Sequence, residues 1–479
     1  MQQTFLPKYC SERAIMIYVS ALVVVSVMYI SRAMLWYWWI FGIVEVAGFF
    51  YFANSLTKRW AHLSERTFKR QLFFVAFFVR LIVMLFLYWF FNEMTGQPFM
   101  FAAADSYAYH ETAQDFVSYI RNGNIALIFD SQYGGGVSDL GYPFYLSLVY
   151  LVTDESILFA RILKCLWGSL TCIFIYKIAR RNFGESVARM AAIFCMLMPN
   201  LIYYCGVHLK ETEMTCLLMA FAERADYVIH QERYDIKSFA AALLLGVSLF
   251  TFRTVLGAAA MFSFVVALVF TNKRVASLGR RWLMLIAIAL ASLYFVGGRI
   301  AREINQYWGA RGTNQSTRLE DRSRKGNTLA KYAGVAVFAP MIFTLPFPTM
   351  VETENQETAR LLHGGNVVKN IMSGFVLFSI VLLIFGSTTN IDILHGEWRN
   401  HLLIEVLLVS YLGILAVSAF AHAERFHMPA IPLEMIFAAY GVSNMTTARY
   451  RRYYMLWCGI MFVAFIGWNW FKMKGRGYA

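Results

Sequence analysis

Residues 71–91 read "QLFFVAFFVRLIVMLFLYWFF", an almost entirely apolar run that is long enough to cross a bilayer as one helix. Similar runs of roughly 17 to 25 residues recur along nearly the whole chain. Of the 479 residues, 59% are hydrophobic and only 15% are charged, whereas soluble domains have about a quarter charged residues. The sequence therefore predicts an all-α, polytopic membrane protein, with about 11–13 transmembrane helices in one integral membrane domain over residues 1–479.

The charges that flank these runs predict how the chain is oriented. The formal net charge is +14, but the basic residues lie mainly between apolar runs. This pattern indicates cytoplasmic loops and contact with membrane lipids rather than nucleic acid. The loop before residues 71–91 carries five basic residues and is predicted to be cytoplasmic. Residues 92–141 then form the first large outer loop, and residues 141–152, too short to span, are predicted to be interfacial or tilted.

The cysteines are predicted to be small buried hydrophobic residues. Nearly all lie within or beside apolar runs, with no CxxC pair, so disulfides and metal ligation are not indicated. The first apolar run is long and lacks a small-residue cleavage pattern, so no cleaved signal peptide is expected. The seven cysteines are Cys10, Cys165, Cys172, Cys195, Cys205, Cys216 and Cys458.

A polar, acidic segment follows the run at 71–91. Residues 102–116 read "AAADSYAYHETAQDF" and place Asp105, His110 and Glu111 within about three helical turns. Asp105 is a candidate general base or metal ligand, but it could equally be the N-cap of a helix that starts just after it. His110 and Glu111 could assist Asp105, although a lone histidine beside a tyrosine is more often a hydrogen-bonded helix residue.

Further ionisable groups are predicted on the same outer side of the membrane. Lys210 and Glu211 stand at the mouth of a membrane helix and are candidates for chemistry, whereas Glu213 is predicted to be a solvated carboxylate of the helix start. Arginines at membrane boundaries either bind phosphate or extend to the interface as snorkelling side chains. Two arginines are predicted at such boundaries: Arg253 in "TFRT", and Arg425, with His427 nearby, in "ERFHMP".

Two later segments have unusual compositions. Residues 297–334 form a predicted outer loop rich in basic residues, which would attract an anionic substrate unless the loop is merely a solvated lid or its side is misassigned. Residues 335–350 contain "FTLPFPT", whose two prolines favour a broken or re-entrant segment. The basic residues singled out for anion binding are Arg318, Arg322, Arg324 and Lys325.

The order of these features resembles the GT-C class of integral membrane glycosyltransferases, particularly the bacterial branch of protein O-mannosyltransferases and lipid A aminoarabinose transferases. The similarity lies in "ADSYAYHETA" in the first outer loop, then "LGYPFYLSLVYLV", and finally "ERFHMPAIPLEMIFAAYG". The motifs are loose, so the likeness depends on their order and topology.

The resemblance implies that a sugar moves from a polyprenyl-phosphate donor to a lipid, glycan or protein acceptor. The site would face outward from the bacterial inner membrane. Asp105 corresponds to the catalytic aspartate of the class, and Glu211 lies near the place where some members carry a second acid. Arg253, Lys210 and Arg425, with His427, would hold the donor phosphate. Members often have a paired-acid motif that is missing here, so a divalent cation, Mg²⁺ or Mn²⁺, stays open, with Asp105 as its ligand if one binds.

Two other classes of protein fit parts of the pattern. An O-antigen polymerase or ligase also uses polyprenyl-linked sugars and would place the chemistry in the basic loop at 297–334. A lipid or glycan transporter would place ionisable residues inside membrane helices, as at Arg80 and Glu405. The clustering of polar groups at one membrane face favours the glycosyltransferase.

Overall fold

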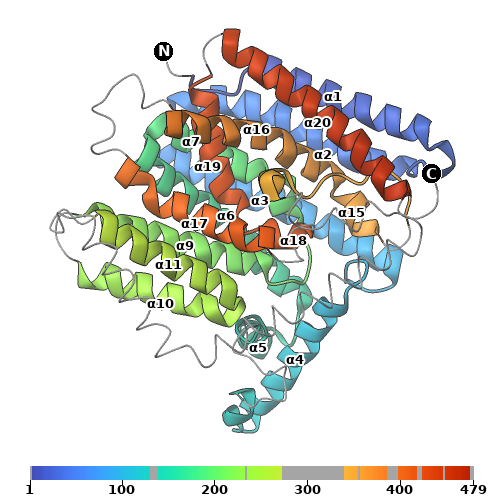
Figure 1. The fold of residues 1–479 in the computed structure, drawn as a ribbon. Coiled ribbons are helices and arrows are strands. Elements are labelled where there is room, and N and C mark those ends of the chain that lie inside the picture. Colours follow the sequence, from blue (N-terminus) through green and yellow to red (C-terminus); the bar gives the residue numbers. More distant parts are fainter. Residues whose placement is uncertain are drawn as a thin grey trace.

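The computed structural model describes residues 3–129, 139–231, 235–271, 339–353, 356–385, 398–417, 423–445 and 448–474, and these residues are almost entirely helical (Figure 1). Within them an isolated antiparallel bridge joins Ala33 and Val351, and no sheet forms. The 3-10 helices are η1 Ile30–Arg32, η2 Trp60–His62, η3 Ile125–Phe129 and η5 Ala339–Thr344. The α-helices are α1 Lys8–Met28, α2 Trp36–Arg59, α3 Glu65–Thr95, α4 Ala104–Arg121, α5 Gly141–Thr153, α6 Ile157–Phe183, α7 Glu185–Leu197, α8 Pro199–Tyr203, α9 Glu211–His230, α10 Ile236–Phe252, α11 Thr254–Thr271, α15 Glu357–Leu361, α16 His363–Phe385, α17 Trp398–Val417, α18 Glu424–His427, α19 Ile431–Ser443 and α20 Ala448–Lys474.

Seven helices within the described ranges are long and apolar enough to span a membrane, which confirms the all-α, polytopic fold. They are α1, α2, α3, α6, α11, α16 and α20, and the shorter apolar helices α10, α17 and α19 accompany them. Helices α5 and α7 have 13 residues each, a length of about 20 Å, which is less than the apolar thickness of a bilayer. A further apolar run in the sequence, residues 282–296, lies outside the described residues, so the total of 11–13 spans stays a prediction.

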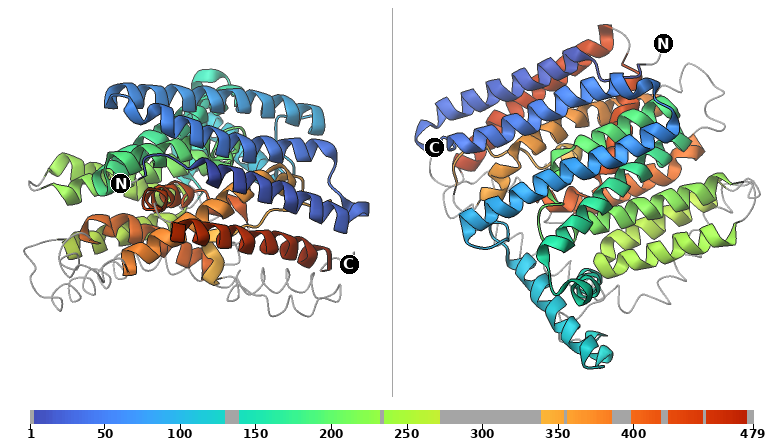
Figure 2. Two further views of the ribbon diagram at one scale, coloured as in Figure 1. Left: turned by 90° about the horizontal axis from the view of Figure 1, so that it is seen from above. Right: turned by 180° about the vertical axis from the view of Figure 1, so that it is seen from behind.

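The long helices lie side by side, and two helices depart from their direction. In Figures 1 and 2, α1, α2 and α20 run alongside one another, and α4 extends away from one end of the bundle. Figure 1 looks nearly along the axis of α5, which therefore lies across the bundle helices. Its buried residues Tyr142, Leu146 and Tyr150 pack against α4. These two helices cover the end of the bundle where the predicted site residues gather.

Arg80 has a structural role inside the bundle. Helix α7 ends at Leu197 because Met198 is extended and Pro199 cannot supply an N–H to continue it. This break leaves the last carbonyl groups of α7 without helical donors. The buried guanidinium of Arg80 donates to the carbonyls of Cys195 and Met196 at 3.3 and 3.2 Å. These contacts explain why Arg80, one of the two ionisable residues that would fit a transporter, lies inside a membrane helix.

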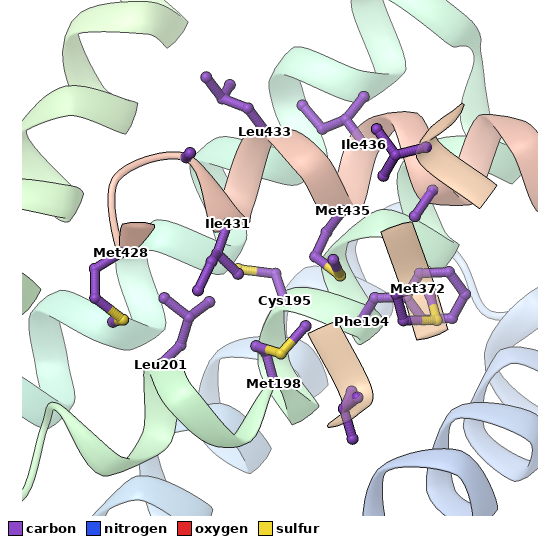
Figure 3. Close-up of a cluster of buried hydrophobic side chains, with 14 of the residues drawn as sticks. Phe194, Cys195, Met198, Leu201, Met372, Met428, Ile431, Leu433, Met435 and Ile436 are labelled. Atoms are coloured by element: carbon purple, nitrogen blue, oxygen red, sulfur yellow. The ribbon is translucent and has the colours of Figure 1, made fainter. Parts of the chain in front are cut away.

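Apolar side chains pack where the α7–α8 break meets α19. Figure 3 shows Met428 and Ile431 near Leu201, while Met372 lies beside Phe194. All of these residues are at most 6% exposed. The seven cysteines are also buried and free, as the sequence predicts. Met428 directly follows α18, so this packing holds the end of that helix.

The proline segment is not a long helix in its described part. Helix η5 is followed by buried, non-helical chain. The amide of Asn370 donates to the carbonyl of Pro346 at 3.2 Å, and the amide of Asn469 donates to that of Pro348 at the same distance. Side-chain amides of α16 and α20 thus satisfy backbone groups that no helix satisfies. The re-entrant path of residues 335–350 stays a prediction.

Candidate active site

Asp105 lies inside the first turn of α4, so of the two alternatives for this residue the N-cap is wrong. The helix begins at Ala104, and the cap position is Ala103, which has no side-chain oxygen to offer. Ala102 takes a left-handed backbone with φ of +52°, which is uncommon for any residue except glycine. The turn presents the Asp105 carboxylate near the positive end of the helix dipole, and its side chain is 47% exposed. The carboxylate is therefore accessible to a substrate.

Two acid–arginine pairs lie at this end of the bundle. The carboxylate of Asp105 pairs with the guanidinium of Arg425, whose side chain is 36% exposed. Glu211, the first residue of α9, lies 3.6 Å from the guanidinium of Arg253, between α10 and α11. Glu211 and Arg253 are only 2% and 8% exposed. One pair is therefore open to solvent and the other is enclosed.

The aromatic ring of Phe426 joins the two pairs. The Cζ atom of Arg253 lies 4.5 Å from the centroid of this ring, and the Cζ atom of Arg425 lies 5.0 Å from it. Both distances are within the range of a cation–π interaction. Four residues singled out from sequence, Asp105, Glu211, Arg253 and Arg425, thus gather around one phenylalanine although they come from distant parts of the chain.

Lys210 borders the same cluster. Its ammonium donates to the carbonyl of Phe252 at 2.6 Å, pairs with Asp139, and lies 5.9 Å from the centroid of Tyr109. Tyr109 in turn donates a hydrogen bond to Asp139 at 3.4 Å. Burial, together with the positive charge of Arg253, lowers the pKa of Lys210 to about 7. Lys210 therefore changes its charge near neutral pH.

His110 and His427 face other partners. His110 shares a hydrogen bond with Tyr150 at 2.8 Å, and Tyr150 contacts His208 at 3.2 Å. Burial lowers the pKa of His110, which favours the neutral form of the imidazole. His427 is fully buried, with its Nδ1 atom 3.1 Å from the ammonium of Lys369. The structure thus does not bring these two histidines into the cluster around Phe426.

The remaining predicted residues lie elsewhere. Glu111 is exposed on α4 and has no ion-pair partner within the described part of the chain. Glu213 is not a solvated carboxylate as expected: it is 5% exposed and pairs with Lys164 at 2.8 Å, because α9 turns this side chain toward α6. The basic residues Arg318, Arg322, Arg324 and Lys325 lie outside the described residues.

Asp105 is not part of a cluster of metal-ligating side chains within the described residues. Its contact is with a guanidinium, and across the described ranges no three His, Cys, Asp or Glu side chains are placed to share a metal ion. Mg²⁺ and Mn²⁺ bind oxygen ligands, and Mg²⁺ often uses one or two carboxylates together with substrate phosphates. A divalent cation with Asp105 as a ligand therefore stays a prediction, while the arginines offer donors for an anionic ligand.

Sequence reasoning did not single out four residues that contact the predicted site residues. One is Lys164, which pairs with Glu213 and stands inside an apolar run, where an ionisable residue is a recognisable signal. Asp139 takes a positive φ of +72° directly before α5 and reaches Lys210. Tyr109 and Phe426 carried no signal, because an aromatic residue beside a charge is common in membrane proteins.

Two family models match separate parts of the chain. Residues 140–297 match the model described as dolichyl-phosphate-mannose-protein mannosyltransferase, and this range holds Lys210, Glu211 and Arg253. Residues 357–472 match the Alg9-like mannosyltransferase family, and this range holds Arg425. Asp105 precedes both matched ranges. No curated protein matches the chain.

Proposed function

Since the chain is an integral membrane glycosyltransferase of the GT-C class, we propose that it transfers a sugar from a polyprenyl-phosphate donor to a hydroxyl group of a lipid, glycan or protein acceptor. Both matched families are described as mannosyltransferases, so mannose is the first donor sugar to test. The observation that carries the proposal is the pairing of Asp105 and Glu211 with two arginines that share the ring of Phe426.

In the proposed reaction, Asp105 acts as the general base. Its carboxylate removes the proton of the acceptor hydroxyl as that oxygen attacks the anomeric carbon of the sugar. The bond between this carbon and the phosphate oxygen breaks, and the polyprenyl phosphate leaves with the bonding electron pair. The attack comes from the side opposite the leaving group, so the configuration at the anomeric carbon is inverted.

The charge of the departing phosphate is held by Arg253, Arg425 and Lys210. A guanidinium presents a fork of N–H donors that matches phosphate oxygens, and a partly buried site strengthens this attraction. Glu211 orients Arg253 through the enclosed pair. His427, which contacts Lys369, supports the turn that carries Arg425.

The site faces the outside of the bacterial inner membrane in this proposal. The adjoining ends of α2 and α3 carry five basic residues, Lys58, Arg59, Arg66, Lys69 and Arg70, which favours the cytoplasmic side. Helix α3 ends at Thr95 on the other side of the membrane, and α4 with Asp105 follows directly. An outward-facing site meets a donor whose sugar has already crossed the membrane.

Replacing Arg253 with methionine tests the donor site. Loss of the guanidinium is expected to raise the KM for a short-chain prenyl-phosphate mannose by about tenfold or more, because a charge-assisted contact to phosphate is lost. Release of prenyl phosphate by the purified protein in detergent measures the reaction. Lys58→Met, at the cytoplasmic end of α2, is the matched control. An unchanged KM in Arg253→Met would remove Arg253 from the donor site.

The pKa of Lys210 predicts how donor binding depends on pH. With a pKa of about 7, the ammonium form falls about tenfold from pH 6 to pH 8. If the charged form holds phosphate, the KM for the donor is expected to rise over this interval by up to about tenfold. Lys210→Arg keeps its charge throughout and is expected to abolish the rise. An equal rise in both proteins would assign the pH dependence to another group.

A further inference from the structure

The ring of Phe426 lies close to two cations that repel each other. The guanidinium carbons of Arg253 and Arg425 are 4.5 and 5.0 Å from the centroid of its ring. The face of an aromatic ring carries partial negative charge, so it attracts both guanidinium groups. A leucine of similar size would fill the space but would not offset the repulsion. The ring therefore favours the close approach of two arginines.

The turn that carries Phe426 is anchored on three sides. The carbonyl of Phe426 accepts a hydrogen bond from the hydroxyl of Tyr411 in α17 at 2.7 Å. Two residues earlier in the chain, the carboxylate of Glu424 accepts a hydrogen bond from the side-chain amide of Asn366 at 3.3 Å. One residue later, the ring of His427 contacts the ammonium of Lys369 at 3.1 Å. These contacts fix the backbone of α18 against α16 and α17. The backbone that carries the ring is thus positioned by contacts with the bundle.

The two arginines differ in how firmly they are held. Arg253 is enclosed with Glu211, whereas Arg425 is one-third exposed and pairs with the half-exposed Asp105. Both guanidinium groups lie within cation–π distance of the Phe426 ring, and the Asp105 side chain stays accessible. Both guanidinium groups can then meet the oxygens of one phosphate.

We propose that Phe426 is a positioning residue whose aromatic ring holds Arg253 and Arg425 together for one donor phosphate. The inference rests on the proposed function, in which the two arginines bind the phosphate of the polyprenyl donor. It predicts that aromatic character at position 426 is required, and that hydrophobic size alone is not sufficient.

The test compares Phe426→Leu with Phe426→Tyr in the full-length, detergent-purified protein. The probe is a short-chain prenyl-phosphate mannose, and both KM for this donor and kcat are measured. Phe426→Leu is expected to raise the KM for the donor about tenfold, since two cation–π contacts are lost. Phe426→Tyr is expected to stay within about twofold of the unmodified protein, because the ring is retained. Phe78→Leu, at an exposed phenylalanine of α3, is the control.

The arginine variants separate failure of this inference from failure of the proposed function. In Arg253→Met, the further effect of Phe426→Leu is expected to shrink to less than about threefold, because one of the two cations is gone. If Arg253→Met and Arg425→Met raise the KM for the donor but Phe426→Leu does not, the positioning role is overturned and the donor site stands. If none of the three substitutions changes this KM, the donor site itself is wrong. Equal losses in Phe426→Leu and Phe426→Tyr would also overturn the requirement for a ring.

Discussion

Replacing Asp105 with asparagine is expected to lower the kcat of sugar transfer by about 100- to 10,000-fold, the usual contribution of a general base. Asparagine has nearly the same shape but cannot accept the proton of the acceptor hydroxyl. The KM for the prenyl-phosphate donor should change little, because in the proposed reaction the arginines hold the phosphate. Prenyl phosphate release, measured over a range of donor concentrations, gives kcat and KM separately.

The contact between Asp105 and Arg425 defines the alternative outcome. If Asp105 only orients Arg425, Asp105→Asn will raise the KM for the donor while kcat stays within a few-fold of the unmodified protein. Asp115→Asn, at an exposed aspartate two to three turns further along α4, serves as the control for a lost carboxylate on this helix. Near-normal kcat in Asp105→Asn would remove Asp105 as the base.

The hydrophobic pattern and the charge of the loops predict much of this molecule. Apolar runs predict the spanning helices because a helix must expose apolar side chains to lipid over its whole length. The same runs, counted from one cytoplasmic loop, place Asp105, Glu211 and Arg253 at one membrane face. In the structure these three residues do lie at one end of the bundle, with Arg425 among them.

The direction in which each side chain points could not be predicted from the sequence. Glu211 and Glu213 are two residues apart on α9, so their side chains leave the helix about 200° apart. One therefore reaches Arg253, and the other reaches Lys164 on α6. Arg425 and His427 are also two residues apart, on α18, so their side chains point in different directions. Which of the two faces the site depends on how helices pack, and this depends on contacts between segments far apart in sequence.

Breaking the buried pair of Lys164 and Glu213 is expected to have the largest effect on stability. The two side chains are 1% and 5% exposed, and the ammonium also donates to the carbonyl of Leu209. Lys164→Met leaves the carboxylate of Glu213 enclosed without its cation. Such a loss destabilises a protein by about 3–5 kcal/mol, because a buried charge without a partner has lost its hydration. Thermal unfolding of the purified protein in detergent should show a clear fall in Tm.

The double variant Lys164→Met/Glu213→Leu distinguishes charge from packing. Removing both members of a buried ion pair is often neutral, so the double variant is expected to regain most of the stability that Lys164→Met loses. Lys69→Met is the matched control, since Lys69 pairs with Glu65 at 3.0 Å but both side chains are more than a third exposed. An exposed pair of this kind contributes at most about 1 kcal/mol. A double variant as unstable as Lys164→Met would mean that the lysine stabilises the fold through its contact with Leu209 and its packing, and not by neutralising Glu213.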